Sequence, residues 1–208
     1  QYCHNPDTWD KNRAVKYEYT PQELLEEVLR YKSFIRNGGV TLTGGEPLVQ
    51  AEFAREYFRL CREAGLHTAL DTSGAICNEQ TLAVLDYTDL LMLDIKALDE
   101  DLCRKVCGSD GRNALRYLDE AQKRGVKVWI RHVVVPGLTD DDEQLDRLVE
   151  YLKGYPVVEK IEWLPYHTMG VFKYEQLGLP YPLKDVEPLS AERIKTIRER
   201  YKDVFPVQ

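Results

Sequence analysis

Residues 40–47 read VTLTGGEP, a short apolar segment that runs into a glycine-rich turn ending in a carboxylate. Apolar residues then follow at helical spacing in residues 51–64, and Gly65 ends that helix. The same cycle of strand, polar turn and helix recurs along the chain. Further strands are expected at residues 68–70, 90–95, 126–134 and 157–164, and further helices at residues 21–35, 78–86, 111–124, 139–153 and 191–202. Because nearly continuous apolar strands alternate with helices, the sequence predicts parallel βαβ units.

Residue types mark several boundaries between these elements. Residues 20–23 form a capping-box pattern with proline at the first helical position. Thr139 and Ser190 are expected to cap two later helices. Residues 165–189 contain four prolines and little periodicity, so this segment is predicted to be a long functional loop or cap.

The composition is typical of a globular chain with an acidic surface. The chain has 208 residues, and 28 lysines and arginines against 35 aspartates and glutamates give a net charge of −7. The length favours a single domain spanning residues 1–208. The negative charge disfavours non-specific binding to nucleic acid and to anionic membranes. No apolar run approaches the ~18 residues of a membrane helix, and no secretory signal is evident, so a cytoplasmic protein is expected.

The cysteines do not follow a pattern typical of disulfides. The five are Cys3, Cys61, Cys77, Cys103 and Cys107. An odd number without disulfide-like spacing favours a reducing compartment. Cys103 and Cys107 are expected on a helix, and we interpret them, like Cys61 and Cys77, as buried structural thiols.

Polar residues gather where each predicted strand ends. The segments are TGGEP at residues 43–47, DTSG at 71–74, MLDIK at 92–96, Arg131 within the fourth of these strands, and LPYH at 164–167. The carboxyl ends of parallel strands lie at one edge of a sheet, where α/β proteins bind ligands. Together these groups fit a zwitterionic or sugar-bearing ligand, with carboxylates for an amine and ribose hydroxyls and cations for a carboxylate.

Each of these groups alone also has a structural explanation. The two glycines could form only a strand-to-helix turn. Asp94 and Lys96, two residues apart on a predicted strand, could be a buried ion pair on one face. His167 could be a core histidine with its hydrogen bonds satisfied. The prediction of a ligand site therefore depends on the whole set lying at one edge.

The start of the chain carries a resemblance to a known family. Residues 2–10, YCHNPDTWD, resemble the end of the CxxxCxxC loop of the pyruvate formate-lyase activating enzymes, which are radical SAM proteins. The other matching segments are GGE at 44–46, DTSG at 71–74, DIK at 94–96, WIRHVVVPG at 129–137 and LPYH at 164–167. The resemblance covers nearly the whole chain in order. It departs at the cluster loop, of whose three cysteines only the last, Cys3, is present.

For the fold, the resemblance implies an α/β, partial open (β/α)6 TIM-like barrel of the radical SAM type, with five of its strands in this chain. The family's first strand and most of its cluster loop are missing, so an N-terminally incomplete chain is expected. Cys103 and Cys107 do not replace the missing cysteines, because Asp110 stands where a third would fall.

For the activity, the resemblance implies that a [4Fe–4S] cluster reductively cleaves S-adenosylmethionine. The resulting 5′-deoxyadenosyl radical would take a hydrogen atom from a glycine of pyruvate formate-lyase. The implied protein is thus an oxidoreductase, an activase of anaerobic metabolism. Its implied partners are that glycyl radical enzyme and a flavodoxin- or ferredoxin-like electron donor.

The matched motifs also imply roles for single residues. The implied catalytic residues are Cys3, as a cluster ligand, Asp94 and Lys96. The residues implied to bind S-adenosylmethionine are Tyr2, Gly44, Gly45, Glu46, Asp94, Lys96, Arg131, Val133, Leu164 and His167. The residues implied to hold a monovalent cation beside it are Asp71, Thr72 and Met92, the last through its carbonyl. Within the larger set, the GGE residues would hold the methionyl amine.

Three other functions stay open at this point. The chain could activate another glycyl radical enzyme or be another radical SAM enzyme, although no second cysteine-rich insert follows Cys3, which favours the pyruvate formate-lyase type. It could be an α/β protein that binds a nucleoside without radical chemistry. It could also be a non-catalytic remnant that binds a partner. For the activase, we expect the glycine loop of the partner to enter past residues 165–189.

Overall fold

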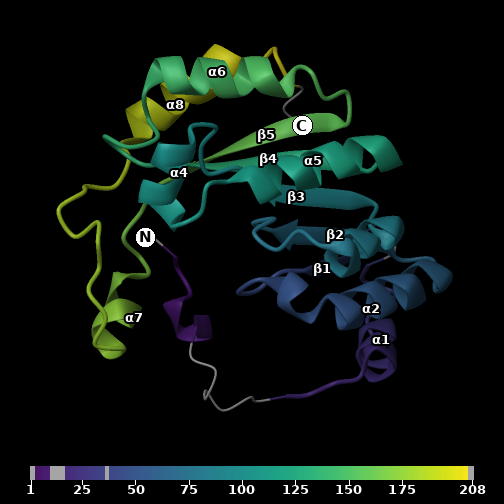
Figure 1. The fold of residues 1–208 in the computed structure, drawn as a ribbon. Coiled ribbons are helices and arrows are strands. Elements are labelled where there is room, and N and C mark those ends of the chain that lie inside the picture. The colour runs from purple at the N-terminus through teal and green to yellow at the C-terminus, as the bar shows by residue number, and fades with distance from the viewer. Residues whose placement is uncertain (1–2, 10–16, 36–37, 206–208) are drawn as a thin grey trace. The chain divides into compact units, whose positions relative to one another are not determined.

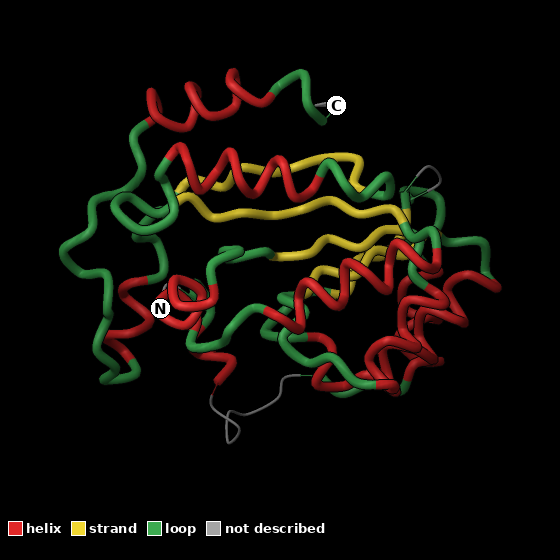
Figure 2. The backbone as a smooth tube through the Cα atoms, turned by 45° about the horizontal axis from the view of Figure 1, so that its top comes forward, coloured by secondary structure: helices red, strands yellow, loops and turns green. Residues whose placement is uncertain are grey.

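The predicted alternation of strands and helices is present in the computed structural model, which describes residues 3–9, 17–35 and 38–205 (Figure 1). The strands are β1 (Gly39–Leu42), β2 (His67–Thr72), β3 (Leu90–Asp94), β4 (Lys127–Val134) and β5 (Val158–Pro165). They form one sheet in the order β1-β2-β3-β4-β5, and helices and loops connect them (Figure 2). The predicted open α/β architecture with five strands is therefore confirmed.

The helices fall between the strands as the sequence periodicity indicates. The α-helices are α1 (Pro21–Leu29), α2 (Ala51–Glu63), α3 (Glu79–Leu82), α4 (Glu100–Cys107), α5 (Arg112–Arg124), α6 (Asp142–Leu152), α7 (Val171–Gln176) and α8 (Ala191–Tyr201). The 3₁₀ helices are η1 (Pro6–Trp9), η2 (Pro47–Gln50) and η3 (Ala83–Tyr87). Within the described ranges, no helix is both long enough and apolar enough to span a membrane.

The chain divides into two compact units. Unit 1 comprises Gln1–Arg13, Ile95–Arg112 and Trp129–Gln208, and unit 2 comprises Ala14–Asp94 and Asn113–Val128. Each unit is described by itself below. The expectation of a single domain over residues 1–208 stays a prediction.

Unit 2 contains three parallel strands, and the apolar side chains are mostly buried on β2 and β3 and half-buried on β1. Val40 of β1 lies beside Thr68 of β2, and Leu70 of β2 lies beside Leu91 of β3. Leu70 and Leu91 are completely buried, and α2 packs against β2. Gly39 begins β1 because there is no room for a side chain: a Cβ there would lie 1.9 Å from the carbonyl oxygen of His67.

Unit 1 contains a small cluster of buried residues from α4 and from the segments that follow β4 and β5. Val106, Val135, Tyr166 and Leu183 are buried together in this core. The Tyr166 hydroxyl lies 2.8 Å from that of Tyr181, so its polar end is satisfied within the cluster. The core thus joins the end of α4 to the segment that follows β5.

The helix caps agree with the sequence at two of three positions. The Thr20 capping box is complete, and the Ser190 hydroxyl accepts a hydrogen bond from the Arg193 amide. The prediction for Thr139 was wrong, because Asp141 caps α6. Thr139 is buried instead, and its hydroxyl donates to the Val133 carbonyl and accepts from the Val135 amide. It therefore closes the turn after β4 rather than starting the helix.

Three predicted elements differ in extent from the observed ones. Residues 165–189 are not loop throughout, since α7 lies within them. The helix expected over 21–35 is regular only to Leu29 and continues as turns. The helix expected over 78–86 is a single α-helical turn followed by the 3₁₀ helix η3, in which Val84 and Leu85 are buried.

Candidate functional site

The glycine-rich turn after β1 is organised by Glu46. Its Oε1 accepts hydrogen bonds from the Thr72 hydroxyl (2.6 Å) and the Leu48 amide (3.1 Å). Its Oε2 accepts from the hydroxyl (2.6 Å) and the amide (3.0 Å) of Ser73. Glu46 also caps η2, so one carboxylate ties the end of β1 to the end of β2 and to the next helix.

These four bonds leave the Glu46 carboxylate little capacity for a ligand. A carboxylate has about four lone-pair positions, and here each oxygen already receives two donors. The main chain before it is more accessible. Gly44 has φ 139°, a conformation that favours glycine, and a Cβ at this position would meet no atom within 4 Å. The turn therefore presents a freely approachable backbone held in place by Glu46.

Oxygen ligands collect on β2 and β3 next to this turn. Asp71 lies beside Met92 in the strand register, and its Oδ2 accepts a hydrogen bond of 3.0 Å from the Thr43 hydroxyl. The Thr72 hydroxyl donates to Glu46 and accepts from the Gly74 amide. The structure thus brings together Asp71, Thr72 and Met92, the three residues predicted to hold a monovalent cation.

In unit 1, His4, the residue after Cys3, stacks on His167. The rings of His4 and His167 are 4.0 Å apart between centroids and inclined by 16°. Burial, followed by the neighbouring His167, lowers the pKa of His4 below its usual value. A neutral His4 ring can stack on His167 without electrostatic repulsion. The first described residues are thereby joined to the segment after β5.

Helix α7 and the residue before it also contact residues 4–7. The Lys173 ammonium donates to Asn5 Oδ1 (2.7 Å) and to Asp7 Oδ1 (3.1 Å). Gly170, the residue before α7, passes so close to His4 that a Cβ would lie 3.0 Å from the His4 Cα atom. The backbone around Cys3 is therefore positioned by α7, which no pattern in the sequence had suggested.

The aromatic ring of Tyr174 adds a third contact between α7 and the first described residues. Tyr174 is 2% exposed and meets the Trp9 ring edge-on at 5.9 Å between centroids. Burial, followed by electrostatic interaction with Cys3, raises the pKa of Tyr174 above its usual value. Neither Tyr174 nor Lys173 was predicted as a site residue. Only the length of the segment and its prolines marked the region.

The residues predicted on β4 and β5 have partners within unit 1. Arg131 lies 3.6 Å from Glu162, which also pairs with Lys160 at 2.7 Å. Val133 packs against the core around Tyr166, and Leu164 is half-buried on β5. The contacts of Arg131 and Val133 with S-adenosylmethionine stay predictions.

The remaining predicted site residues are Asp94, Lys96 and Tyr2. Asp94 is the last residue of β3, so Lys96 lies beyond the strand, and strand geometry does not by itself place the two side chains on one face. Lys96 lines a cavity of about 190 Å³ together with Asp99, His132 and Arg147. Tyr2, predicted to lie against adenine, falls outside the described residues.

Comparisons with known proteins decide the family. The model of the radical SAM superfamily matches residues 1–149. The pyruvate formate-lyase-activating enzyme of Clostridium pasteurianum is 44% identical over 98% of this chain and 85% of its own length. The pyruvate formate-lyase 1-activating enzyme of Escherichia coli (strain K12) is 42% identical over 96% of this chain and 83% of its own length. The chain belongs to the pyruvate formate-lyase-activating enzymes of the radical SAM superfamily.

Solved structures agree with this family. A domain of the pyruvate-formate lyase-activating enzyme from Bacteroides vulgatus superposes with a TM-score of 0.64 at 25% identity, covering 80% of this chain and 94% of that one. Streptococcus suis SuiB bound to its precursor peptide SuiA has a TM-score of 0.68 at 20% identity, over 97% of this chain and 42% of that one, and shows the shared fold alone.

Membership of the radical SAM superfamily implies S-adenosylmethionine and an iron–sulfur cluster. The accessible main chain at Gly44 and the polar oxygen atoms of Thr43 and Asp71 beside it fit a zwitterionic ligand. The described residues do not fit the iron–sulfur cluster as they fit S-adenosylmethionine. Among the described residues, no group of three or more His, Cys, Asp or Glu side chains could hold a metal ion, so they offer the cluster Cys3 but not a three-thiolate site.

Proposed function

We propose that this protein activates pyruvate formate-lyase by generating a glycyl radical on it, with S-adenosylmethionine as the radical source. The observation that carries the proposal is the 44% identity over almost the whole chain to an activating enzyme of that name. When bound, the iron–sulfur cluster supplies the electron that cleaves the S-adenosylmethionine sulfonium. The protein's own residues bind and orient the ligands and exclude water.

Unit 2 would hold the methionyl end of S-adenosylmethionine. Glu46 fixes the turn through four hydrogen bonds, and the carbonyl oxygens of Gly44 and Gly45 would accept hydrogen bonds from the ammonium group. Asp94, at the carboxyl end of β3, would bind ribose hydroxyls. Glu46 thus acts as a positioning residue for the glycines rather than as the main ligand.

Within unit 1, the residues implied to bind S-adenosylmethionine have cationic or apolar side chains. Lys96 and His167 would face the methionyl carboxylate and the ribose, and Arg131 would add positive charge. Val133 and Leu164 would line the adenine pocket. Cys3 would give one thiolate to the cluster, on a backbone positioned by the contacts of His4 and α7.

We also propose a monovalent cation between the ends of β2 and β3. The Asp71 carboxylate and the main-chain carbonyl of Met92, its neighbour in the register, are hard oxygen donors suited to such an ion. Asp71→Asn should therefore weaken the dependence of S-adenosylmethionine binding on K⁺. Calorimetric titrations in KCl and in tetramethylammonium chloride should show a difference in Kd of about fivefold for the wild type and none for the variant. Equal affinities for the wild type in both salts would remove the cation from the proposal.

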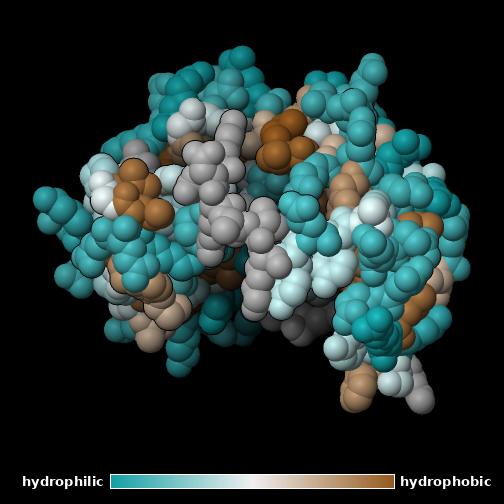
Figure 3. All heavy atoms as spheres, turned by 90° about the horizontal axis from the view of Figure 1, so that it is seen from below, coloured by the Kyte–Doolittle hydropathy of each residue, from teal (hydrophilic) through white to brown (hydrophobic). Residues whose placement is uncertain are grey.

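The glycine-bearing loop of the partner would pass the segment around α7. Four apolar side chains there are exposed, namely Met169, Phe172, Leu177 and Leu179. Apolar side chains form only small separate groups on the largely hydrophilic face drawn in Figure 3. An apolar lip of this kind suits docking of a loop that must be shielded from water.

The double substitution Met169→Ser and Phe172→Ser should impair recognition of the partner without affecting the cofactor. We expect KM for pyruvate formate-lyase to rise about thirtyfold, because the two truncated contacts contribute about 1 kcal/mol each, while the rate of uncoupled S-adenosylmethionine cleavage is unchanged. Phe34→Ser is the matched control, since Phe34 is 85% exposed in unit 2. An unchanged KM for the double variant would contradict docking at this lip. Deleting residues 165–189 is a poorer test, because α7 also holds the backbone around Cys3.

The proposed function is tested by electron paramagnetic resonance. Protein produced anaerobically from its complete gene is reduced and mixed with S-adenosylmethionine and pyruvate formate-lyase. A glycyl radical doublet in the partner, together with one 5′-deoxyadenosine per radical, is the expected result. Cleavage of S-adenosylmethionine without a radical on this partner would instead favour another glycyl radical enzyme as the substrate. We propose that the electron comes from a flavodoxin- or ferredoxin-like donor and that the reaction takes place in the cytoplasm.

A further inference from the structure

Helix α4 carries two cysteines that the proposed function does not use. Cys103 and Cys107 lie one turn apart, and their sulfur atoms are 3.5 Å from each other. Cys103 is 2% exposed, whereas Cys107 is exposed, so the expectation that both are buried structural thiols was wrong for Cys107. One thiol is thus open to reagents in solvent, and the second lies directly behind it.

The surroundings favour a reactive thiolate at Cys107. The contact between the two sulfur atoms, in which either thiol can be the donor, lowers the pKa of Cys107 to about 6 and raises that of Cys103. Positive charge at Lys96 contributes in the same direction. The negative groups facing the pair are Asp110 on the following loop and the carboxyl end of α4 itself, and the exposure of Cys107 to water limits their effect.

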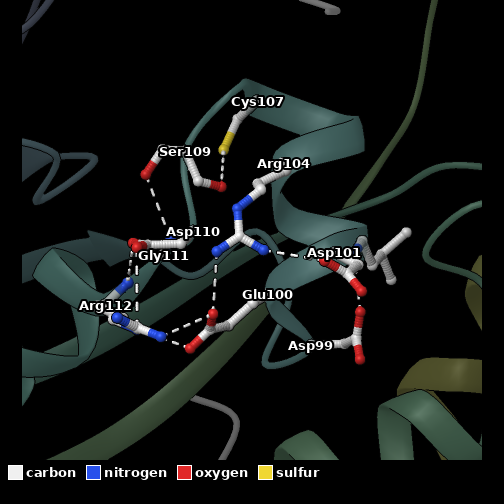
Figure 4. Close-up of polar contacts among 10 residues, drawn as sticks. Asp99, Glu100, Asp101, Arg104, Cys107, Ser109, Asp110, Gly111 and Arg112 are labelled. Carbon is white, nitrogen blue, oxygen red and sulfur yellow. Dashed lines mark hydrogen bonds and ion pairs between the residues drawn. The ribbon is translucent and has the colours of Figure 1, made fainter.

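The two ends of α4 are held very differently. At its start, Asp99 caps the Leu102 amide at 2.7 Å, and Glu100 joins Arg104 and Arg112 in a network of ion pairs (Figure 4). At its end, Cys107 is the last helical residue, followed by Gly108 in the left-handed conformation with φ 80°. Figure 4 shows the Cys107 side chain near Ser109, away from the ion pairs. Because Val106 anchors the final turn in the core, the movement open to the pair lies in the Cys107 side chain and in the backbone at Gly108.

We propose that Cys107 and Cys103 form a dithiol redox site that reacts with low-molecular-weight disulfides, with Cys107 as the attacking thiol and Cys103 as the resolving thiol. The Cys107 thiolate attacks one sulfur of the small disulfide, forms a mixed disulfide and releases one thiolate. The Cys103 thiol then loses its proton to that thiolate, attacks the Cys107 sulfur and expels the second thiolate. The protein loses two electrons and two protons, and one small disulfide becomes two thiols.

The helix geometry predicts that the resulting disulfide is readily reduced. Residues four apart on a helix have Cβ atoms about 5–6 Å apart, whereas a disulfide requires about 3.5–4.5 Å. The two Cβ atoms must therefore approach each other by roughly 0.5–2.5 Å, and this strain favours the dithiol. The backbone of Gly111 packs against the Cys103 sulfur, where a Cβ would lie 2.9 Å away, so Cys103 stays in place and Cys107 has to move.

The test uses the cluster-loaded protein under argon, with glutathione disulfide as the probe and mass spectrometry of tryptic peptides as the readout. For the wild type we expect a loss of two hydrogens from the peptides carrying Cys103 and Cys107, reversed by dithiothreitol. Cys103→Ser should instead accumulate one glutathione on Cys107, at least about tenfold faster than on Cys77, whose pKa is raised by burial. Cys107→Ser should show neither product, and Cys77→Ser should behave as the wild type.

Each other outcome overturns the proposal. An unmodified wild type would show that Cys107 is not reactive, and a stable mixed disulfide on it would show that Cys103 does not resolve. Cys103→Ala serves as a second variant if the buried serine prevents folding, which circular dichroism would reveal. Because no arm measures activation of a partner, failure of this site and failure of the proposed function are distinguishable.

Discussion

Replacing Glu46 with glutamine should weaken S-adenosylmethionine binding by at least about tenfold and lower the free energy of unfolding by about 1–3 kcal/mol. The carboxylate accepts from two hydroxyls and two main-chain amides. A carboxamide has one accepting oxygen, and its NH₂ group would face either the Leu48 or the Ser73 amide. The hydroxyls of Thr72 and Ser73 can rotate to accept a hydrogen bond, but a main-chain N–H cannot. At least one donor is therefore left without a partner, and the turn at Gly44 and Gly45 shifts.

Urea unfolding and calorimetric titration with S-adenosylmethionine measure the two effects separately. Glu52→Gln is the matched control, because Glu52 lies exposed in the first turn of α2 in the same unit. Weaker binding with unchanged stability would show that Glu46 contacts the ligand directly. Unchanged binding and unchanged stability together would contradict the positioning role.

Replacing Gly170 with valine should have the largest effect on the residues around Cys3. A Cβ at Gly170 would lie 3.0 Å from the His4 Cα atom and 3.3 Å from its carbonyl oxygen. Both are backbone atoms, so α7 or the backbone of His4 must move, and overpacking of this kind costs about 1–3 kcal/mol. The shift would separate the stacked rings of His4 and His167 and break the contacts of Lys173 with Asn5 and Asp7.

The expected result is loss of more than roughly half of the bound iron and a fall in partner activation of about a hundredfold, the latter corresponding to about 2.7 kcal/mol. Iron analysis, the spectrum of the reduced cluster and the glycyl radical yield provide the measurement. Gly38→Val is the control, since a Cβ at Gly38 would meet only the Ile35 carbonyl oxygen, at 3.9 Å. Full iron content and an unchanged spectrum in Gly170→Val would show that α7 does not position Cys3.

The two variants separate the contributions of the two units. Glu46→Gln acts within unit 2 and should leave iron content unchanged, whereas Gly170→Val acts within unit 1. If both variants lost iron, a general loss of stability would explain the results better than two positioning roles. Thermal unfolding monitored for both proteins distinguishes these explanations.

Local sequence determined the strands, most of the helices and the position of the polar residues. Strand and helix periodicity, the capping box at Thr20 and the cap at Ser190 depend on interactions over a few residues, so they can be recognised from neighbouring letters. The glycine-rich turn and the carboxylates were also predictable, because the ends of parallel strands gather at one edge. Thr139 shows the limit: its residue type suits a cap, but its hydroxyl bonds the main chain of β4 and the turn after it.

The tertiary structure alone decided which side chains act on each other. Glu46 finds its donors on Thr72 and Ser73, more than twenty residues away, and Lys173 reaches Asn5 across more than 160 residues. Such pairs carry no periodicity, because their spacing along the chain is set by how the elements pack and not by the geometry of one helix or strand. Burial is decided in the same way. Cys103 and Cys107 share one short helix, and only packing made the first inaccessible and left the second open to solvent.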